Sequence, residues 1–390
     1  MSKAVILDAV RTPIGRFRGD LANIRGDHLG AHVLQSLMAR TGLSPEMVDD
    51  VVFGCVTQVG EQSTNMARTS LLGAGWPETI PGVTIDRKCG SSEAAVHMAA
   101  AEIAAGYANV VVAGGVESMT RVPMGSNRSI HGEPFGYKLT DRFEMTSQGE
   151  SAERLCDIWG FSRDDLDDFA FESHRRAAAA ADAGYFDREI APVRVADWQE
   201  RTAEPSDAVV SADQTIRRET TREKLGTLKP SFRENGRVTA GNASQIADGA
   251  AALLIASEEA ADRLGVRPRA RIVAATTVGS DPTLMLTGPV AATRKVLDMA
   301  GLRLSDIDLF EVNEAFASVP LMWLKEIGAD RDRLNVNGGA IALGHPLGGS
   351  GARLMTTLLH ELERRGARYG LQSMCCAGGL ATATIIERLD

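Results

Sequence analysis

The sequence lacks a surplus of basic residues, and this limits its partners. Its 390 residues include 42 lysines and arginines against 51 aspartates and glutamates, a formal net charge of -9. A protein of this charge has no excess of cations to displace counterions from nucleic-acid phosphates. We therefore expect no general affinity for nucleic acid. An anionic small ligand would need a local cluster of arginines and lysines.

Long apolar runs are also missing. The N-terminal stretch MSKAVILDAV holds only a short hydrophobic segment before Arg11, too short for the apolar core of a secretory signal. No other run reaches the roughly 20 residues that a membrane-spanning helix needs. The hydrophobic fraction of 44% and the charged fraction of 24% are those of an ordinary globular protein. We expect a cytoplasmic protein with no membrane span.

Cysteine is scarce, and no two cysteines have the CxxC spacing of zinc or thioredoxin-like sites. The five are Cys55, Cys89, Cys156, Cys375 and Cys376. Without an export signal we expect reduced thiols, and the adjacent Cys375 and Cys376 are badly placed to form a disulfide with each other. The sequence therefore argues against a metal site and against dithiol redox chemistry.

Short apolar runs alternate with helical stretches in the first part of the chain. Compact runs of this kind predict strands buried on both faces, here at 4–10, 50–56, 83–89 and 109–116. The alanine-rich segment after the third run predicts a helix that ends at Gly106. Strands that alternate with helices predict an α/β fold with a parallel-rich, doubly wound sheet.

The middle of the chain has a different character. From about residue 120 it is rich in glycine, proline and serine. One clear amphipathic helix follows, which Ser162 caps and Gly184 ends, and then the charged run IRRETTREKLGTLKP. We interpret residues 120–244 as a domain inserted between strands, and as a candidate for gripping a ligand.

The opening pattern returns from about residue 270, which indicates an internal duplication. Two pairs of segments resemble each other at the same spacing, 43–56 with 302–315 and 101–115 with 360–379. We therefore divide the rest of the chain into a first half at 1–119, completed by about 245–268, and a second half at 269–390. A duplicated α/β unit brings equivalent loops together, where sites commonly form.

Cys89 lies where a predicted strand meets the start of a predicted helix. The free N–H groups and positive potential of a helix start favour a thiolate over a thiol, so Cys89 is a candidate nucleophile. The alternative is a small buried residue at the end of a strand.

His345 lies in the glycine-rich stretch NVNGGAIALGHPLGGSGARLM, which covers 335–355. The glycines and Pro346 predict a loop that leads into a helix near Ser350, with the backbone close to a ligand. A neutral histidine there can deprotonate a thiol, although a structural histidine is the alternative. The stretch lacks the GK[ST] ending of a phosphate-binding loop.

The run EVNEAFA at 311–317 places Asn313 and Glu314 among apolar residues. Buried polar groups need hydrogen-bond partners. A structural role at the end of a strand is one reading of both side chains, and a role in a site is the other.

These motifs together resemble the thiolase family, the acyl-CoA acetyltransferases and 3-ketoacyl-CoA thiolases. The resemblance rests on DRKCGSS, NEAFA, GGAIALGHPLGGSGAR and a final cysteine before a glycine pair, in that order along the whole chain. It implies two βαβαβαββ-type halves packed in α-β-α-β-α layers, with an inserted loop domain that binds CoA. It also implies a homodimer or homotetramer, CoA as a substrate, and no metal or redox cofactor.

The resemblance assigns a role to each motif. Cys89 would carry the acyl group, His345 would activate it, Asn313 would hold a water in an oxyanion hole, and Cys375 would move the α-proton of the acetyl unit. Backbone N–H groups at Cys89 and Ala377 would form a second oxyanion hole. The residues expected to bind substrate are Arg217 and Ser244 on CoA, together with Phe316, Gln148 and Met285.

The two adjacent cysteines cannot share the catalytic role, because neighbouring side chains of a strand point to opposite faces. Cys376 makes a literal Cys-x-Gly with Gly378, but the family-like spacing from His345 favours Cys375 and leaves Cys376 as apolar filler. Ala377 stands where the family usually has glycine, which would be costly if its φ were positive.

The sequence favours one branch of the family over the other. Ser147 and Gln148 stand where the short-substrate branch usually has His-Met. We therefore expect a degradative 3-ketoacyl-CoA thiolase. The alternatives are a biosynthetic acetoacetyl-CoA thiolase and, in a different class, a non-catalytic acyl-CoA-binding or lipid-binding relative.

Overall fold

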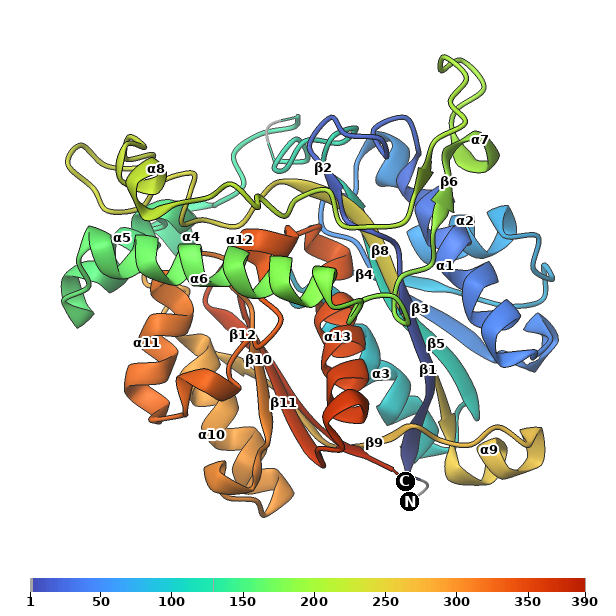
Figure 1. Ribbon diagram of the computed structural model, residues 1–390. Coiled ribbons are helices and arrows are strands. Elements are labelled where there is room, and N and C mark those ends of the chain that lie inside the picture. The colour runs from blue at the N-terminus through green and yellow to red at the C-terminus, as the bar shows by residue number, and fades with distance from the viewer. Residues whose placement is uncertain (1–2, 129, 390) are drawn as a thin grey trace.

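The computed structural model describes residues 3–128 and 130–389. Figure 1 shows the elements of the first half, which are β1 (Ala4–Arg11), β2 (Gly15–Arg16), α1 (Gly26–Thr41), β3 (Asp50–Gly54), α2 (Met66–Gly73), β4 (Val83–Ile85), α3 (Ser91–Ala105), β5 (Val110–Ser118) and β8 (Ala247–Ser257). The elements that follow are α9 (Glu258–Leu264), β9 (Ala270–Gly279), α10 (Gly288–Ala300), β10 (Leu309–Val312), α11 (Ser318–Ile327), α12 (Ala340–Leu343), α13 (Ser350–Arg365), β11 (Tyr369–Cys376) and β12 (Leu380–Arg388).

The long strands form one mixed sheet in the order β10-β11-β12-β9-β1-β8-β5-β3-β4. Pairing is parallel toward both ends, between β10 and β11, β3 and β5, and β3 and β4, whereas the middle strands pair antiparallel. The alternation of strands and helices in the sequence accounts for the parallel pairs, because a parallel connection needs a crossover helix.

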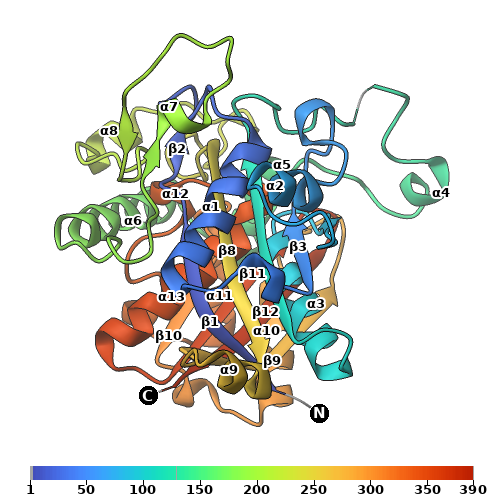
Figure 2. The same cartoon turned by 90° about the vertical axis from the view of Figure 1, so that its right-hand side faces the viewer.

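Three apolar layers hold this sheet. One core cluster joins α1 and α2 to the first-half strands, another joins α10 and α11 to β10, β11 and β12, and a third lies around α3 and α13. Helices α3 and α13 lie side by side in Figure 1 and contact each other, and Figure 2 shows α1 in front of the first-half strands. The chain is thus an α/β protein in which α3 and α13 form the central helical layer.

The two halves repeat the same local structure. A short 3-10 helix and a strand occur at Pro45–Met47 with β3, and again at Leu304–Asp306 with β10. The helix, glycine and strand of α3 and β5 recur as α13 and β11, and Gly106 and Gly366 both end their helix with a positive φ. These are the segment pairs that the sequence indicates as duplicated.

The segment between β5 and β8 carries α4 (Tyr137–Thr140), α5 (Gln148–Trp159), α6 (Arg163–Asp182), β6 (Val193–Arg194), α7 (Val195–Trp198), β7 (Val209–Val210) and α8 (Arg222–Gly226). Ser162 and Asp165 form a capping box at the start of α6, as the sequence predicts for Ser162. Figure 1 shows α6 lying across α12, which leads to His345. No helix in the described part of the chain is long and apolar enough to cross a membrane.

The turn after His345 touches the first-half strands backbone to backbone. A Cβ on Gly348 would lie 2.6 Å from the carbonyl oxygen of Gly54, and a Cβ on Gly115 would collide with the carbonyl oxygen of Gly348. The buried carboxylate of Glu117 fixes the same contact, because it accepts the N–H groups of Gly348, Val56 and Thr57, each at 2.9 Å. Glycine at these positions lets the His345 turn approach β3 and β5.

This contact predicts a large effect of one added methyl group. Gly115→Ala should lower the free energy of unfolding by about 3 kcal/mol, because the added Cβ would collide with the buried backbone of Gly348 and Gly54. Gly136→Ala is the matched control, since its Cβ would meet nothing within 4 Å, and it should change stability by less than about 0.5 kcal/mol. Chemical denaturation measures both, and equal stabilities would contradict this account.

Candidate active site

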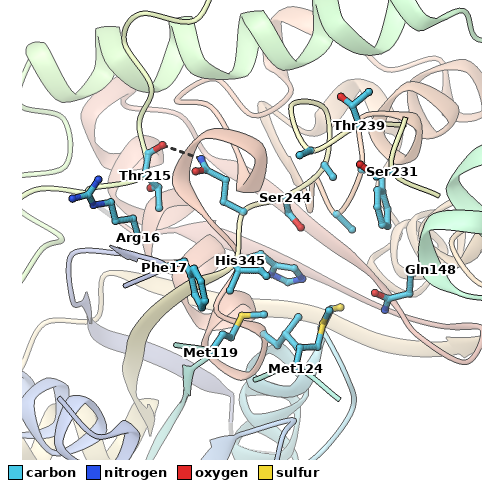
Figure 3. A pocket seen from close by; sticks show the side chains of 18 of the residues that line it. Arg16, Phe17, Met119, Met124, Gln148, Thr215, Ser231, Thr239, Ser244 and His345 are labelled. Carbon is cyan, nitrogen blue, oxygen red and sulfur yellow. Dashed lines mark hydrogen bonds between the residues drawn. The ribbon is translucent and has the colours of Figure 1, made fainter. Parts of the chain in front are cut away.

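Cys89 and His345 line a single cavity of about 690 Å³. Figure 3 shows His345 in its middle, with Thr215, Ser231 and Thr239 above it and Phe17, Met119 and Met124 below. The cavity brings together residues from both halves of the chain, as the expected duplication requires. It is the place where the candidate residues can be compared.

Cys89 is placed by the turn between β4 and α3. Lys88 takes a positive φ of 51°, and Cys89 follows it, two residues before α3 begins at Ser91, and is 4% exposed. Burial raises the pKa of the Cys89 thiol to about 11. The N–H groups of Cys89 and Ala377 act in the opposite direction, because they favour the thiolate. The expected preference for a thiolate is therefore wrong for the free protein, since burial outweighs the helix start.

His345 is held as a neutral base by its neighbours. Its Nδ1 lies 2.6 Å from Ser350 Oγ, and the Ser350 hydroxyl donates to the carbonyl oxygen of Pro346 at 2.8 Å. Because that hydroxyl proton is already used, Ser350 Oγ accepts from Nδ1–H, and Nε2 keeps its lone pair. Burial, reinforced by the charge of Arg353, lowers the pKa of His345 to about 3. His345 can therefore accept a proton at neutral pH.

Gln245, just after the inserted segment, also fixes the position of the His345 backbone. The His345 N–H donates to the carbonyl oxygen of Gln245 at 3.0 Å. The Gln245 side chain donates in turn to the carbonyl oxygens of Thr215 at 2.8 Å, drawn in Figure 3, and of Ile341 at 2.9 Å. One side chain thus ties the His345 loop to the segment that carries Arg217.

Asn313 follows β10 and faces the histidine. Its Nδ2 lies 3.4 Å from His345 Nε2, and its Oδ1 is buried with no hydrogen-bond partner among the described residues. Glu314 has a structural role instead, because its carboxylate accepts hydrogen bonds from Ser173 Oγ, Asn335 Nδ2 and the Ile341 N–H. Of the two candidates in EVNEAFA, only Asn313 contacts His345, and Glu314 bonds to residues that do not line the cavity.

The two C-terminal cysteines end β11 and point to opposite sides. Cys375 belongs to the apolar cluster of Met285 and Phe316, whereas Cys376 Sγ lies 2.7 Å from where a Cβ of Gly90 would be. Each is buried, and the nearby Cys89 helps to raise the pKa of both thiols. The structure separates the two environments as strand alternation predicts, but both sulfurs stay close to Cys89.

Ala377 carries no backbone strain. It is absent from the residues with positive φ, whereas Gly378 and Gly379 have φ of 88° and 75°. The two residues of this turn with a left-handed conformation, Gly378 and Gly379, therefore come after Ala377. Its N–H still reaches Cys89.

The expected substrate-binding residues divide into two groups. Arg217, Ser244, Phe316 and Gln148 line the cavity, whereas Met285 is buried in the second-half core and does not. Within the basic run, Arg218 pairs with Asp182 and Arg222 with Asp168, both on α6. Only Arg217 of that run borders the cavity, and its N–H donates to His174 Nδ1 at 3.2 Å.

Sequence reasoning missed two groups that hold the site. Glu117 lies in the stretch VVAGGVESM and looks like any acidic residue after a strand, so nothing local reveals its three backbone partners. Ser350 lies five residues after His345, and its place as the expected first residue of a helix was a usable signal. A serine there can accept from the histidine ring.

Comparisons with known proteins agree along the whole chain. The thiolase N-terminal domain family matches residues 4–259 and the thiolase C-terminal domain family matches residues 266–388. A steroid 3-ketoacyl-CoA thiolase of Mycobacterium tuberculosis is 47% identical over 100% of this chain and 95% of its own length. A beta-ketoadipyl-CoA thiolase of Acinetobacter baylyi is 45% identical over 100% of both.

A solved structure shows the same fold. The crystal structure of the Bacillus anthracis acetyl-CoA acetyltransferase superposes with a TM-score of 0.91 at 41% identity, covering 100% of this chain and 99% of that one. The α/β architecture expected from the sequence is thereby confirmed.

The raised pKa of Cys89 gives a prediction for the free protein. Alkylation of Cys89 by iodoacetamide should speed up about tenfold per pH unit from pH 8 to pH 10, because the thiolate fraction still grows below a pKa of about 11. Peptide mass spectrometry measures the rate. The urea-unfolded protein is the control, and its rate should level off near pH 9. A plateau below pH 8 in the folded protein would show a preformed thiolate instead.

Proposed function

Because the chain belongs to the thiolase family, we propose that it is an acyltransferase that cleaves 3-ketoacyl-CoA with CoA, to acetyl-CoA and a shortened acyl-CoA. The observation that carries this proposal is that a buried thiol, Cys89, and a histidine whose Nε2 keeps its lone pair, His345, line the same cavity. The names of its relatives, a steroid 3-ketoacyl-CoA thiolase and a beta-ketoadipyl-CoA thiolase, support the same reaction.

The first half-reaction breaks the carbon–carbon bond. His345 Nε2 takes the proton of Cys89, whose sulfur attacks the ketone carbon of the substrate. The bond between Cα and Cβ then breaks, which leaves the acyl group on Cys89 and the enolate of acetyl-CoA. Cys375 gives its proton to the enolate carbon, and acetyl-CoA departs.

The second half-reaction returns the acyl group to CoA. The Cys375 thiolate takes the thiol proton of the incoming CoA, and the CoA sulfur attacks the acyl carbon on Cys89. Cys89 leaves as a thiolate and recovers its proton from His345. The two half-reactions share one acyl-Cys89 intermediate, so the kinetics are ping-pong, and the reverse direction is a Claisen condensation.

Each half of the chemistry develops negative charge on an oxygen, and the chain offers a donor set for each. The N–H groups of Cys89 and Ala377 lie at the nucleophile, where the tetrahedral intermediate forms. Once His345 carries a proton, its Nε2–H can donate to the enolate oxygen, with a water held by Asn313 beside it. Cys89, Asn313 and His345 are buried, and hydrogen-bond donors act more strongly at such low-dielectric positions.

The presence of Gln148 favours a degradative role over a biosynthetic one. This residue lines the cavity, and Ser147 before it is used to cap α5 by accepting the Glu150 N–H at 3.1 Å. The biosynthetic acetoacetyl-CoA reaction is the second candidate, favoured by the likeness to an acetyl-CoA acetyltransferase. A protein that only binds acyl-CoA or lipid would not need Cys89 and His345 in the same cavity.

We also infer how the rest of the chain serves this reaction. The inserted segment 120–244 binds CoA, with Arg217 near the phosphates and Ser244 on the pantetheine arm. The protein acts in the cytoplasm as a homodimer or homotetramer. Strand β4, at the end of the sheet beside the Cys89 turn, supports an oligomer because no described strand pairs with its outer side.

Thiolytic activity is the direct test. The purified protein with CoA and 3-ketoacyl-CoA substrates should remove the absorbance of the ketoacyl enolate, and no cleavage at any chain length would refute the proposal. Cys89→Ser should abolish the acyl adduct seen by mass spectrometry in the wild type. An adduct that persists on Cys375 or Cys376 would show that the roles are assigned wrongly.

The hydrogen bond that fixes the His345 tautomer has a kinetic signature. Ser350→Ala should lower kcat about 10- to 100-fold with little change in KM, because Nδ1–H loses its acceptor and the wrong tautomer becomes accessible. Thr356→Val is the matched control, a buried hydroxyl of the same helix that donates only to the carbonyl oxygen of Ala352. Steady-state kinetics measure both, and equal kcat values would rule out the role of Ser350.

A further inference from the structure

A second hollow lies outside the active-site cavity and is lined mainly by arginine. It has a volume of about 280 Å³ and lies between α6, the end of α13 and the segment at 332–337. Figures 1 and 2 show α6 and α13 on the same face of the molecule. None of the described residues that line this hollow also lines the cavity of Cys89 and His345. The proposed thiolase reaction therefore does not account for it.

Four cations and one anion line this hollow. The cations are Arg175 and Arg176 on α6 and Arg364 and Arg365 on α13, and the anion is Asp332. The Asp332 side chain is 91% exposed and lies 3.5 Å from Arg176 Nη2, so this ion pair contributes little. Like charges from two separate elements therefore meet in one place, where they repel each other unless carboxylates or a bound anion compensate for them.

The two arginines of α6 share one carboxylate. Glu172 accepts hydrogen bonds from Arg175 Nε at 2.7 Å and from Arg176 Nε at 2.8 Å. Arg176 is held further because its Nη1 donates to the carbonyl oxygen of Leu334 at 2.7 Å. One carboxylate cannot neutralise two guanidinium groups, which are always charged, so this pair keeps a positive charge.

The two arginines of α13 repeat this arrangement. Glu361 is buried and accepts from Arg364 Nε at 2.7 Å and from Arg365 Nε. The Arg364 guanidinium also lies 3.7 Å from the centre of the Tyr185 ring, and this contact with an aromatic ring helps to hold it in place. Two half-neutralised pairs thus meet in one hollow, with guanidinium groups that are already positioned before a ligand binds.

Donor groups remain for a ligand. Nη1 of Arg175, Nη1 of Arg364 and both Nη atoms of Arg365 have no hydrogen-bond partner among the described residues. The N–H groups of a guanidinium match the oxygens of a phosphate or carboxylate group. Because these donors come from two helices, a ligand with two anionic groups can contact both arginine pairs at once.

We propose that this hollow binds a small polyvalent anion, one that carries at least two phosphate or carboxylate groups. The site is separate from the active-site cavity, so this inference does not rest on the thiolase reaction. A bound anion neutralises both arginine pairs and joins α6 of the inserted segment to α13 of the second half. It should therefore raise the unfolding temperature as its concentration rises above Kd.

Isothermal titration calorimetry at low salt tests the site with the intact protein. Inorganic pyrophosphate and citrate are the probes, and inorganic phosphate, with one anionic group, is the comparison. We expect one pyrophosphate or citrate per chain, bound at least about tenfold more tightly than phosphate, because the second group adds hydrogen bonds to the other arginine pair. The tighter probe identifies the ligand as one of phosphate or of carboxylate type. Binding of neither probe, or binding no tighter than that of phosphate, would overturn the proposal.

Arg175→Gln and Arg365→Gln test the residues. These side chains are 59% and 40% exposed, one on each helix, so each variant should fold and should weaken binding of the tighter probe about tenfold. Arg303→Gln is the matched control, since that arginine is 82% exposed, pairs with Asp306 and lies outside the hollow, and its affinity should match the wild type. Equal weakening in all three variants would reveal only an adventitious attraction of anions to positive surface, and would overturn the site.

Arg217→Gln separates this site from the active-site cavity. Arg217 borders that cavity, where pyrophosphate would occupy the proposed place of the CoA phosphates. Binding that persists in Arg217→Gln supports the second hollow. Binding lost in Arg217→Gln and kept in Arg175→Gln would place the anion in the active-site cavity and overturn the proposal.

Discussion

The active site depends on one backbone contact, that between the turn after His345 and the strands β3 and β5. Glycine at Gly115 and Gly348 lets the two backbones touch, and Glu117 joins them by accepting N–H groups from both sides. The turn belongs to the second half of the chain and the strands to the first. This contact helps to fix the distance between the base and the nucleophile, because Cys89 and His345 share no element of secondary structure.

Burial leaves the two reacting groups, Cys89 and His345, uncharged in the resting site. The pKa of Cys89 is raised to about 11 and that of His345 is lowered to about 3, in both cases mainly by desolvation. A thiolate–imidazolium pair is therefore costly before substrate binds. In the proposed reaction the charge is created during attack, and the N–H groups of Cys89 and Ala377 would then stabilise the transition state more than the ground state.

The lining of the cavity comes largely from the segment between β5 and β8. That segment supplies the hydroxyl groups of Thr215, Ser231, Thr239 and Ser244, and Gln245 near its end also holds the His345 backbone. Phe17, which follows β2, lines the cavity from the first half. If the inserted segment binds CoA as proposed, CoA binding and the position of the base are coupled through one stretch of chain.

The sequence by itself determined the α/β class, the duplication, the capped helix α6 and the identity of Cys89, His345 and Asn313 as the candidates. These are local signals, since glycine spacing, caps and short motifs act within a few residues. It could not determine the protonation of Cys89, because the expected effect of a helix start was smaller than the burial created by the whole fold. It also could not reveal the partners of Glu117, the ordinary φ of Ala377 or the core position of Met285. Those depend on contacts between residues far apart in the chain, and only the tertiary structure brings such residues together.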